Sequence, residues 1–269
     1  MPAPLARLAT DRRRTAYLTR LALDTDRFFE PRRADCPWCA STRLYTRPPA
    51  RGGLTTDECR DCAHVFQNPR LTAEGMAFYD HDPAAPRPAS ARRRHRAAAR
   101  AMLPLTEPES WLDVGTGEAG FPRAAVEFFP YTSFDGTDPT PRVLKARAAE
   151  HVEEAYVGPL ATPALTAHLR ARYDVVSILH HLEHTPDPRA ELRAALTVLR
   201  PGGHLLLHLT DPAAPLRLAP RPPHTLHLFP RQNLHAELKA QGCAILTPPR
   251  PAPFATSYRV IARTPARPR

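Results

Sequence analysis

Residues 111–121 read WLDVGTGEAGF, and this stretch decides the fold of the chain. A short apolar run ends in an acid, Asp113, and a glycine-punctuated turn follows directly. Eighteen residues after Gly120, a second acid, Asp138, closes another apolar segment. Glycines let a backbone approach a ligand closely, and an acid on the neighbouring strand can accept hydrogen bonds from ribose hydroxyls. The stretch predicts a nucleotide-type crevice at the carboxyl ends of two adjacent parallel strands.

From Trp111 onward, short apolar runs alternate with helical stretches, which is the pattern of a sheet built from strand–helix–strand crossovers. The expected strands are residues 110–114, 131–137, 153–157, 173–179, 203–209, 242–247 and 257–263. The expected helices are residues 119–129, 141–150, 161–170, 188–199 and 231–241. We predict an α/β fold with a Rossmann-like, seven-stranded, mostly parallel sheet and helices on both faces.

The first third of the chain has a different character. Residues 4–30 carry Ala, Leu and Arg at helical spacing and predict one or two amphipathic helices. Residues 36–69 suit a small, loop-rich module, and the proline-rich stretch 82–88 marks a boundary. We therefore expect an N-terminal domain over residues 1–83 and a main domain over residues 84–269.

Four cysteines form two CxxC knuckles, Cys36/Cys39 and Cys59/Cys62, separated by nineteen residues. Each knuckle presents two thiolates from one turn, and two knuckles complete a tetrahedral sulfur site. A pair of disulfides is the alternative, which a cytoplasmic setting disfavours. The spacing predicts a zinc ribbon holding a structural Zn²⁺, with no open ligand position for catalysis. The fifth cysteine, Cys243, is expected to be buried.

The net charge of +10 over 269 residues raises the question of nucleic-acid binding. Lysine occurs only at Lys145 and Lys239, so 35 of the 37 basic residues are arginine. This bias is typical of a GC-rich genome, because selection for phosphate contacts would not suppress lysine. Residues 92–96 (RRRHR) are the best candidate for an anion patch. A nucleic-acid partner is nevertheless unlikely by this reasoning.

Neither a membrane nor a secretion signal is indicated by the sequence. The N-terminus has no apolar signal core before its charges, and no apolar run approaches the roughly 20 residues of a membrane helix. We expect a cytoplasmic protein with no membrane partner. The sequence indicates no oligomeric state.

Four motifs in order resemble those of class I S-adenosylmethionine-dependent methyltransferases. Residues 112–117 (LDVGTG) resemble the first motif, and residues 136–140 (GTDPT) resemble the acidic second-strand motif. Residues 173–179 (YDVVSIL) resemble the fourth strand, which ends at the methyl-transfer site, and residues 199–203 (LRPGG) resemble the following turn. With the cysteine module, the chain is similar to bacterial enzymes that carry an N-terminal zinc ribbon, some of which modify sugars and other small metabolites.

The resemblance implies methyl transfer from S-adenosylmethionine to an O, N or C nucleophile of a small-molecule acceptor. The cofactor-binding residues that it implies are Asp113, Gly115, Gly117, Asp138 and Leu179. The chain departs from the family pattern twice: Ala119 replaces the usual third glycine, and no acid stands at residues 157–160, where the third strand ends. The spacing of Gly115, Gly117 and Gly120 also fits a dinucleotide-binding loop, but the later motifs disfavour a hydride-transfer enzyme.

Residues 180–184 (HHLEH) follow the fourth strand and are expected to face the crevice. Histidine suits proton removal near neutral pH, so His181 and His184 are the candidate catalytic bases, with Glu183 able to orient one of them. The alternative is that Glu183 and His184 only cap the next helix. The HxxEH pattern also matches inverted zinc peptidases, but the prolines at positions 186 and 188 disfavour the helix that they need.

Three further residues are candidates for the acceptor pocket: His224 and His227, in a loop before the last helix, and Tyr79, beyond the cysteine module. Two other functions stay open. The basic residues and the ribbon are compatible with an RNA methyltransferase, and the fold is compatible with a protein that binds the cofactor without catalysis.

Overall fold

The computed structural model describes residues 25–47, 55–80, 90–213, 224–247 and 256–266. Its contacts divide the chain into two compact units, Met1–Pro86 with Pro215–Pro230 and Arg87–Ala214 with Arg231–Arg269. The predicted helices over residues 4–30 lie almost wholly outside the described residues. So does the predicted boundary at residue 83.

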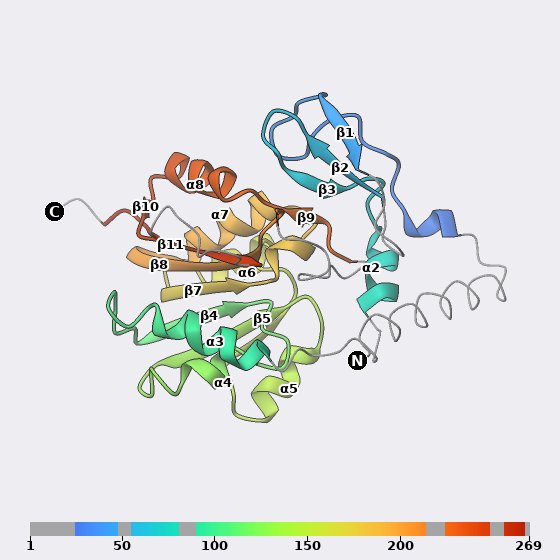
Figure 1. Ribbon diagram of the computed structural model, residues 1–269. Coiled ribbons are helices and arrows are strands. Elements are labelled where there is room, and N and C mark those ends of the chain that lie inside the picture. The colour runs from blue at the N-terminus through green and yellow to red at the C-terminus, as the bar shows by residue number, and fades with distance from the viewer. Residues whose placement is uncertain (1–24, 48–54, 81–89, 214–223, 248–255, 267–269) are drawn as a thin grey trace. The chain divides into compact units, whose positions relative to one another are not determined.

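The second unit is built on one seven-stranded sheet in the order β10-β11-β8-β7-β4-β5-β6 (Figure 1). Its strands are β4 (Ser110–Val114), β5 (Ser133–Asp138), β6 (Ala155–Val157), β7 (Tyr173–Leu179), β8 (Leu199–Thr210), β10 (Ala244–Ile245) and β11 (Ser257–Arg263). Strands β4 to β8 pair in parallel, whereas β11 is antiparallel to both β8 and β10. The predicted α/β fold with a mostly parallel sheet is confirmed.

Helices cover both faces of this sheet. They are α3 (Ser90–Arg100), α4 (Pro122–Ala125), α5 (Arg142–Ala148), α6 (Pro163–His168), α7 (Pro188–Val198) and α8 (Arg231–Ala240). Figure 1 shows α3, α4 and α5 on one side of the sheet and α7 and α8 on the other. Helix α7 begins where the sequence signals it: the Asp187 carboxylate accepts from Ala190 N (3.0 Å), and Pro188 opens the helix.

Apolar side chains between the α3 side and the sheet form the main core. Trp111 is fully buried and lies with its ring centroid 5.4–5.6 Å from those of Phe121, Phe129 and Phe134. Ala98 of α3 and Met102, just after that helix, are fully buried in the same cluster. The small residues of α3 therefore hold this basic helix against the sheet.

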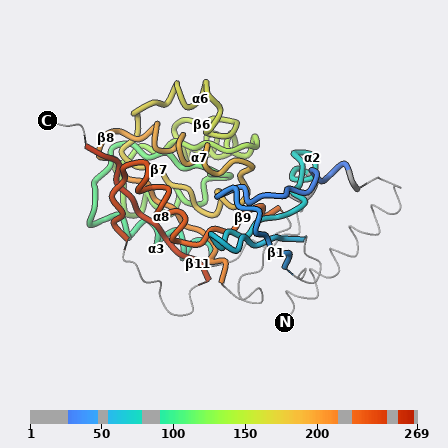
Figure 2. The backbone as a smooth tube through the Cα atoms, turned by 90° about the horizontal axis from the view of Figure 1, so that it is seen from above, coloured from blue at the N-terminus to red at the C-terminus, as the bar shows by residue number. Residues whose placement is uncertain are grey.

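The first unit contains a four-stranded antiparallel sheet in the order β1-β2-β3-β9. Its elements are η1 (Thr25–Phe28), β1 (Leu44–Arg47), β2 (Thr56–Cys59), β3 (Val65–Gln67), α2 (Ala73–Asp80) and β9 (His227–Leu228). Both views show β9, far along the chain, beside the strands of the cysteine module (Figures 1 and 2). His64 and Phe66 pack there with Phe229, and the His64 and Phe229 ring centroids are 4.9 Å apart.

No helix among the described residues is both long enough and apolar enough to span a bilayer.

Candidate active site

The crevice is set by the strand order. Strand β4 pairs with β5 on one side and with β7 on the other. The chain therefore runs outward from β4 to β5 and β6, and then returns to β7 on the other side of β4. At such a switch point the loops separate beyond the carboxyl ends of the strands and leave a ligand crevice. The loop after β4 and the residues after Leu179 of β7 therefore border one site, as the sequence predicts.

The loop after β4 takes backbone conformations that favour glycine. Gly115 has φ +73° and Gly117 has φ +54°. Ala119, which replaces the usual third glycine, also has a positive φ, +60°. That conformation costs a non-glycine residue about 1–2 kcal/mol. The substitution is accommodated because the methyl group is fully buried in the core and Ala119 N donates to Thr116 O (2.9 Å).

Asp138 is the last residue of β5 and is hydrogen-bonded to the glycine loop. Its Oδ2 accepts from Gly117 N (2.9 Å), and its Oδ1 accepts from both Thr140 N (2.8 Å) and Thr140 Oγ1 (2.6 Å). The residue is 4% exposed. The acid therefore orders the loop that the cofactor would contact.

Asp113 ties β4 to β7 beneath that loop. Its Oδ1 accepts from Ser177 Oγ (2.6 Å) and its Oδ2 accepts from Thr116 Oγ1 (2.7 Å). Burial raises the pKa of Asp113 to about 7, and the hydrogen bonds from Ser177 and Thr116 offset only part of that effect. The Asp113 carboxyl group therefore stabilises the glycine loop through its hydrogen bond with Thr116.

Glu191 of α7 holds the loop after β6, a role that the sequence analysis missed. Its carboxylate is fully buried and accepts from Leu160 N (3.1 Å) and Ala161 N (3.0 Å). Burial raises the pKa of this carboxyl group. Residues 157–160 contain no acid of their own, and Glu191 supplies one to this loop from α7. Its oxygens accept from backbone N–H groups of the loop.

His181 lies directly against the glycine loop. A Cβ placed on Gly115 would collide with the His181 ring, so the absence of a side chain there makes room for the imidazole. His181 Nε2 is 4.0 Å from Glu191 Oε1. Burial, reinforced by His184, lowers the pKa of His181 to about 4. The ring is therefore neutral at pH 7.

A second polar group lies where β7 and β8 end. His180 has a positive φ, +53°, and its Nδ1 is 3.4 Å from Glu183 Oε1, which also accepts from Thr210 N (2.8 Å). The His180 and His208 ring centroids are 4.7 Å apart, and His208 Nε2 lies 2.9 Å from Ser257 Oγ. The sequence analysis missed His180 and His208, although the HHLEH run already contained the first.

The pKa values of Glu183 and His208 are both lowered, which makes one residue an anion and leaves the other neutral. Burial raises the pKa of Glu183, but hydrogen bonding from His180, the charges of His180 and His184, and Thr210 N outweigh it and bring the value to about 2. Burial, with repulsion from His180 and Arg259, lowers the pKa of His208 to about 3. Glu183 is therefore an anion and His208 a neutral ring over the physiological range.

Three buried polar atoms of this group have no hydrogen-bond partner in the described part of the chain: His180 Nε2, Glu183 Oε2 and His208 Nδ1. Buried polar atoms are nearly always paired in folded proteins, so such exceptions mark places where a ligand or a reaction supplies the partner. We name this set the β7–β8 cluster.

The remaining predicted residues are distributed as follows. Leu179 ends β7 and is half-buried against the main core, while His184 ends the 3₁₀ turn η2 (Leu182–His184). His227 belongs to the first unit, where its Nδ1 is 3.1 Å from His64 Nε2. His224 belongs to that unit too, and Tyr79 lies among residues whose side chains are not described.

The four cysteines form one compact cluster in the first unit. Their sulfur atoms lie within 4.8 Å of one another, with Cys36 Sγ 3.7 Å from Cys62 Sγ and Cys39 Sγ 3.5 Å from Cys59 Sγ. All are free thiols, so the disulfide alternative is absent. A tetrahedral zinc with Zn–S bonds of about 2.3 Å needs sulfurs about 3.8 Å apart. The cluster fits a zinc ribbon.

Comparison with known proteins agrees with this geometry. A family model described as "Methyltransferase domain" matches residues 85–247. The ubiquinone biosynthesis O-methyltransferase of Azotobacter vinelandii is 31% identical over 148 residues, which are 50% of this chain and 64% of that relative. The chain therefore spans less than two thirds of the length of this curated relative.

Solved structures share the fold at low sequence identity. The N-methyltransferase NodS from Bradyrhizobium japonicum WM9, in complex with S-adenosyl-l-homocysteine, has a TM-score of 0.52 at 15% identity, over 71% of this chain and 97% of that one. The complex of the Haloferax volcanii Trm112 methyltransferase activator with a putative methyltransferase gives a TM-score of 0.53 at 17% identity, with the same coverage.

Proposed function

Because this chain belongs to the methyltransferase-domain family, we propose that it transfers the methyl group of S-adenosylmethionine to a small-molecule acceptor. The observation that carries the proposal is the glycine loop fastened to Asp138 at the switch point of the sheet. The relatives in sequence are ubiquinone biosynthesis O-methyltransferases, whereas the structural neighbour NodS is an N-methyltransferase. An oxygen acceptor is therefore our first expectation.

The residues of the loop fit the cofactor. Gly117 leaves the backbone uncovered at a positive φ, Gly115 makes room for the His181 ring beside it, and the carboxylate of Asp138 accepts from Gly117 N. We propose that Gly115, Gly117, Asp138 and Leu179 contact the cofactor and that Asp113 supports the loop through Thr116. When bound, S-adenosylmethionine supplies an activated methyl group on a sulfonium, which needs no metal or redox partner to be transferred.

The protein must align the acceptor and remove its proton. His181 and His184 are the sequence-based candidates for the base, and the geometry adds His180. A carboxylate at Nδ1 favours the tautomer in which Nε2 carries the lone pair, and Glu183 stands 3.4 Å from His180 Nδ1. Of the three histidines, His180 has the clearest arrangement for accepting a proton at Nε2.

We propose that the cysteine cluster holds one structural Zn²⁺, with Cys36, Cys39, Cys59 and Cys62 as ligands. Trp38 N donates to Cys36 Sγ (3.4 Å). We also keep residues 1–83 and 84–269 as the two functional domains, with β9 of the second contributing to the sheet of the first.

The cofactor proposal is tested by calorimetry with S-adenosylhomocysteine, which should bind with a stoichiometry of about one per chain. Absence of binding would contradict it. Transfer is then tested with tritium-labelled S-adenosylmethionine and a panel of hydroxylated aromatic and sugar acceptors. Cofactor binding without transfer to any acceptor would favour a protein that binds without catalysis.

The zinc proposal is tested by metal analysis of the purified chain, which should contain about one zinc. Cys59→Ser should remove the metal and lower the melting temperature of the first unit, since a structural zinc contributes folding energy directly. Cys243→Ser is the matched control, because that thiol is buried in the second unit. Zinc retained by the Cys59→Ser protein would contradict the ligand assignment.

A further inference from the structure

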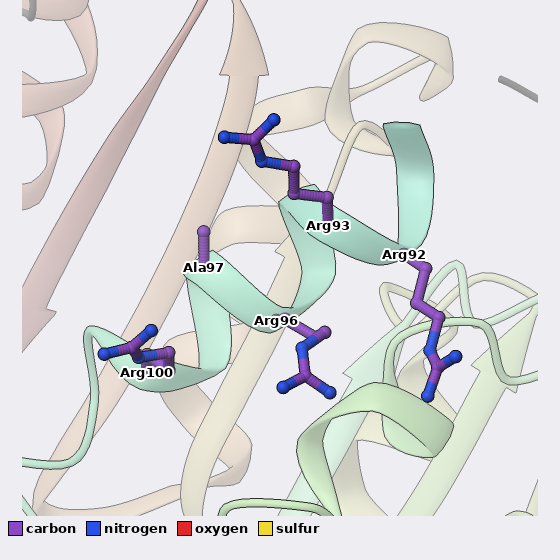
Figure 3. Close-up of a pocket in the computed structure, with 5 residues that line it drawn as sticks. All are labelled: Arg92, Arg93, Arg96, Ala97 and Arg100. Atoms are coloured by element: carbon purple, nitrogen blue, oxygen red, sulfur yellow. The ribbon is translucent and has the colours of Figure 1, made fainter. Parts of the chain in front are cut away.

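Helix α3 presents two different faces. One face buries Ala98 and Ala99 in the main core, and His95 packs edge-on against Phe121 of the glycine-loop segment, with ring centroids 6.1 Å apart. The other face lines a hollow of about 530 Å³ (Figure 3). The lining residues are Arg92, Arg93, Arg96, Ala97 and Arg100.

Two of the four arginines share one acidic partner. Arg92 and Arg96 both pair with the single carboxylate of Glu127, and Arg92 Nη2 lies 2.8 Å from its Oε1. Arg93 and Arg100 are exposed and have no acidic partner in the part of the chain that the structure describes. The hollow thus keeps an excess of positive charge.

Arg93 and Arg100, which have no acidic partner among the described residues, lie on the same side of the helix. Figure 3 shows Arg93 and Arg100 on the side from which Ala97 projects, whereas Arg92 and Arg96 point away from it. The methyl group of Ala97 is the smallest side chain that can separate them, and it leaves room beside the helix. This arrangement forms a notch with a guanidinium at each end.

A third arginine, from the sheet, contacts the backbone of α3 next to the notch without lining the hollow itself. Arg259 of β11 donates from Nη1 to Ala97 O (2.9 Å), and its buried Nε has no hydrogen-bond partner among the described residues. An arginine with a buried, unpaired N–H beside two uncompensated arginines is an arrangement that favours an anion.

The strand register relates this notch to the reaction site. Leu179 of β7 pairs with His208 of β8, and His208 pairs with Arg259 of β11, so the three residues form one row across the sheet. Neighbouring strands lie about 4.8 Å apart, which places the backbone of Arg259 about 10 Å from the end of β7. Residues in register share a face of the sheet, so the row and α3 lie on the same side.

We propose that Arg93 and Arg100, with Arg259 adding positive charge beside them, bind a phosphate or diphosphate group of the methyl acceptor. This inference rests on the proposed function and names the acceptor class: a phosphate-bearing small molecule. The volume lies within the roughly 300–1,000 Å³ usual for ligand pockets. A notch about two helix turns long suits one such group, whereas RNA binding needs a longer charged track.

The test uses inorganic pyrophosphate as the probe and the full-length protein at about 20 mM salt, where screening is weak. Affinity is measured by calorimetry for the wild type and for the double variant Arg93→Gln/Arg100→Gln. We expect each single variant to lose about tenfold to hundredfold in affinity and the double variant to lose about hundredfold or more, since each charged hydrogen bond contributes about 1.5–3 kcal/mol. Arg193→Gln, an exposed arginine of α7, is the matched control and should bind as the wild type does.

Thermal melting and S-adenosylhomocysteine affinity are measured on all three proteins and should be unchanged, because both substituted arginines are exposed. The single variants Arg93→Gln and Arg100→Gln replace the double variant if it melts early. Equal pyrophosphate affinity in all proteins, or none in the wild type, overturns the proposal. Much tighter, steeply salt-dependent binding of a single-stranded RNA overturns it in favour of an RNA acceptor. Failure of S-adenosylhomocysteine to bind would overturn the proposed function alone.

Discussion

The two sides of the crevice differ in how their polar atoms are used. On the β4–β5 side, all four carboxylate oxygens of Asp113 and Asp138 accept hydrogen bonds from the protein. On the β7–β8 side, His180, Glu183 and His208 each keep a buried atom without a partner among the described residues. We call the β4–β5 side closed, because its carboxylate oxygens are hydrogen-bonded within the protein, and the β7–β8 side open, because three of its buried polar atoms are not.

The difference has a physical meaning. A buried polar atom without a hydrogen bond costs about 1–3 kcal/mol. A site that binds one invariant cofactor gains from a loop that is already ordered, because less entropy is lost on binding. A site that must take a proton from an acceptor needs unoccupied lone pairs. The open side is therefore where we place the acceptor chemistry.

The largest expected effect comes from removing the base. Replacing the catalytic histidine by Asn should lower kcat by about 10²- to 10⁴-fold, because general base catalysis contributes that much. We expect His180→Asn to show this loss, with smaller losses for His181→Asn and His184→Asn. The measurement is tritium transfer to the acceptor that the panel identifies.

A spectroscopic control separates catalysis from mere packing. In ¹⁵N-histidine NMR spectra, His180 should carry its proton on Nδ1, and Glu183→Gln should weaken that preference because the charge at Nδ1 is lost. S-adenosylhomocysteine affinity should stay unchanged in His180→Asn and Glu183→Gln. A proton on His180 Nε2 at pH 8 would contradict its role as the base.

The next effect concerns the closed side. Asp138→Ala removes the acceptor of Gly117 N and Thr140 N and should weaken S-adenosylhomocysteine binding by about 10- to 150-fold, the equivalent of about 1.5–3 kcal/mol. Calorimetry measures the change. Asp174→Ala is the control, because Asp174 accepts from Ser110 N (3.1 Å) and from Arg200 Nη1 (2.7 Å) at the opposite edge of the sheet.

Asp174→Ala should lower the melting temperature while leaving the affinity for S-adenosylhomocysteine intact. Equal weakening of binding in both variants would show that Asp138 acts only through general stability. Unchanged binding in Asp138→Ala would remove the residue from the cofactor site.

A smaller effect tests how tightly the closed side is packed. Gly115→Ala should destabilise the protein by about 1–3 kcal/mol, since its Cβ would overlap the His181 ring at a positive φ. Adding His181→Ala should recover the steric part of this loss and leave the backbone part. Urea unfolding of the two single variants and the double variant measures the coupling, and strict additivity would contradict the contact.

The last effect is a change in the pH dependence of stability, spread over several pH units. The pKa of Asp113 is raised from 3.8 to about 7 in the folded state, so the folded protein binds a proton here more tightly than the unfolded chain. The contribution of this raised pKa to the free energy of unfolding is fully present below pH 4. It is lost as pH rises towards 7, with a slope of up to about 1.4 kcal/mol per pH unit. Asp113→Asn should remove that slope from urea-derived free energies between pH 5 and about 7. Parallel curves for the two proteins would contradict the raised pKa.

The sequence predicted the sheet well, because buried parallel strands are marked by dense apolar runs. The ranges 110–114, 173–179 and 257–263 match β4, β7 and β11 at both ends. The predicted helix over residues 119–129 shrinks to α4, since its first residue, Ala119, is held at a positive φ. Strand β8 begins before the expected residue 203, because Leu199 already pairs with Tyr173 of β7.

The site was predictable only where it depends on local sequence. Gly115, Gly117 and Asp138 were identified because turn chemistry fixes them within one or two strands. Glu191 and His208 were missed because each reaches the crevice through pairing of distant segments, and neither stands in a motif. No local signal could have placed His227 beside His64, which is 163 residues away in the chain.

Strand β9 has a consequence for the order in which the protein is made. The sheet of the cysteine module is complete only when His227–Leu228 pairs with Val65–Phe66, and Leu226 O accepts from Gln67 N (2.8 Å). At about 5–20 residues per second, the ribosome needs roughly 10–30 s to add the intervening residues. The part of the chain that is translated first is therefore finished late, after most of the second unit has emerged. During that interval the exposed edge of β3 is open to other strands.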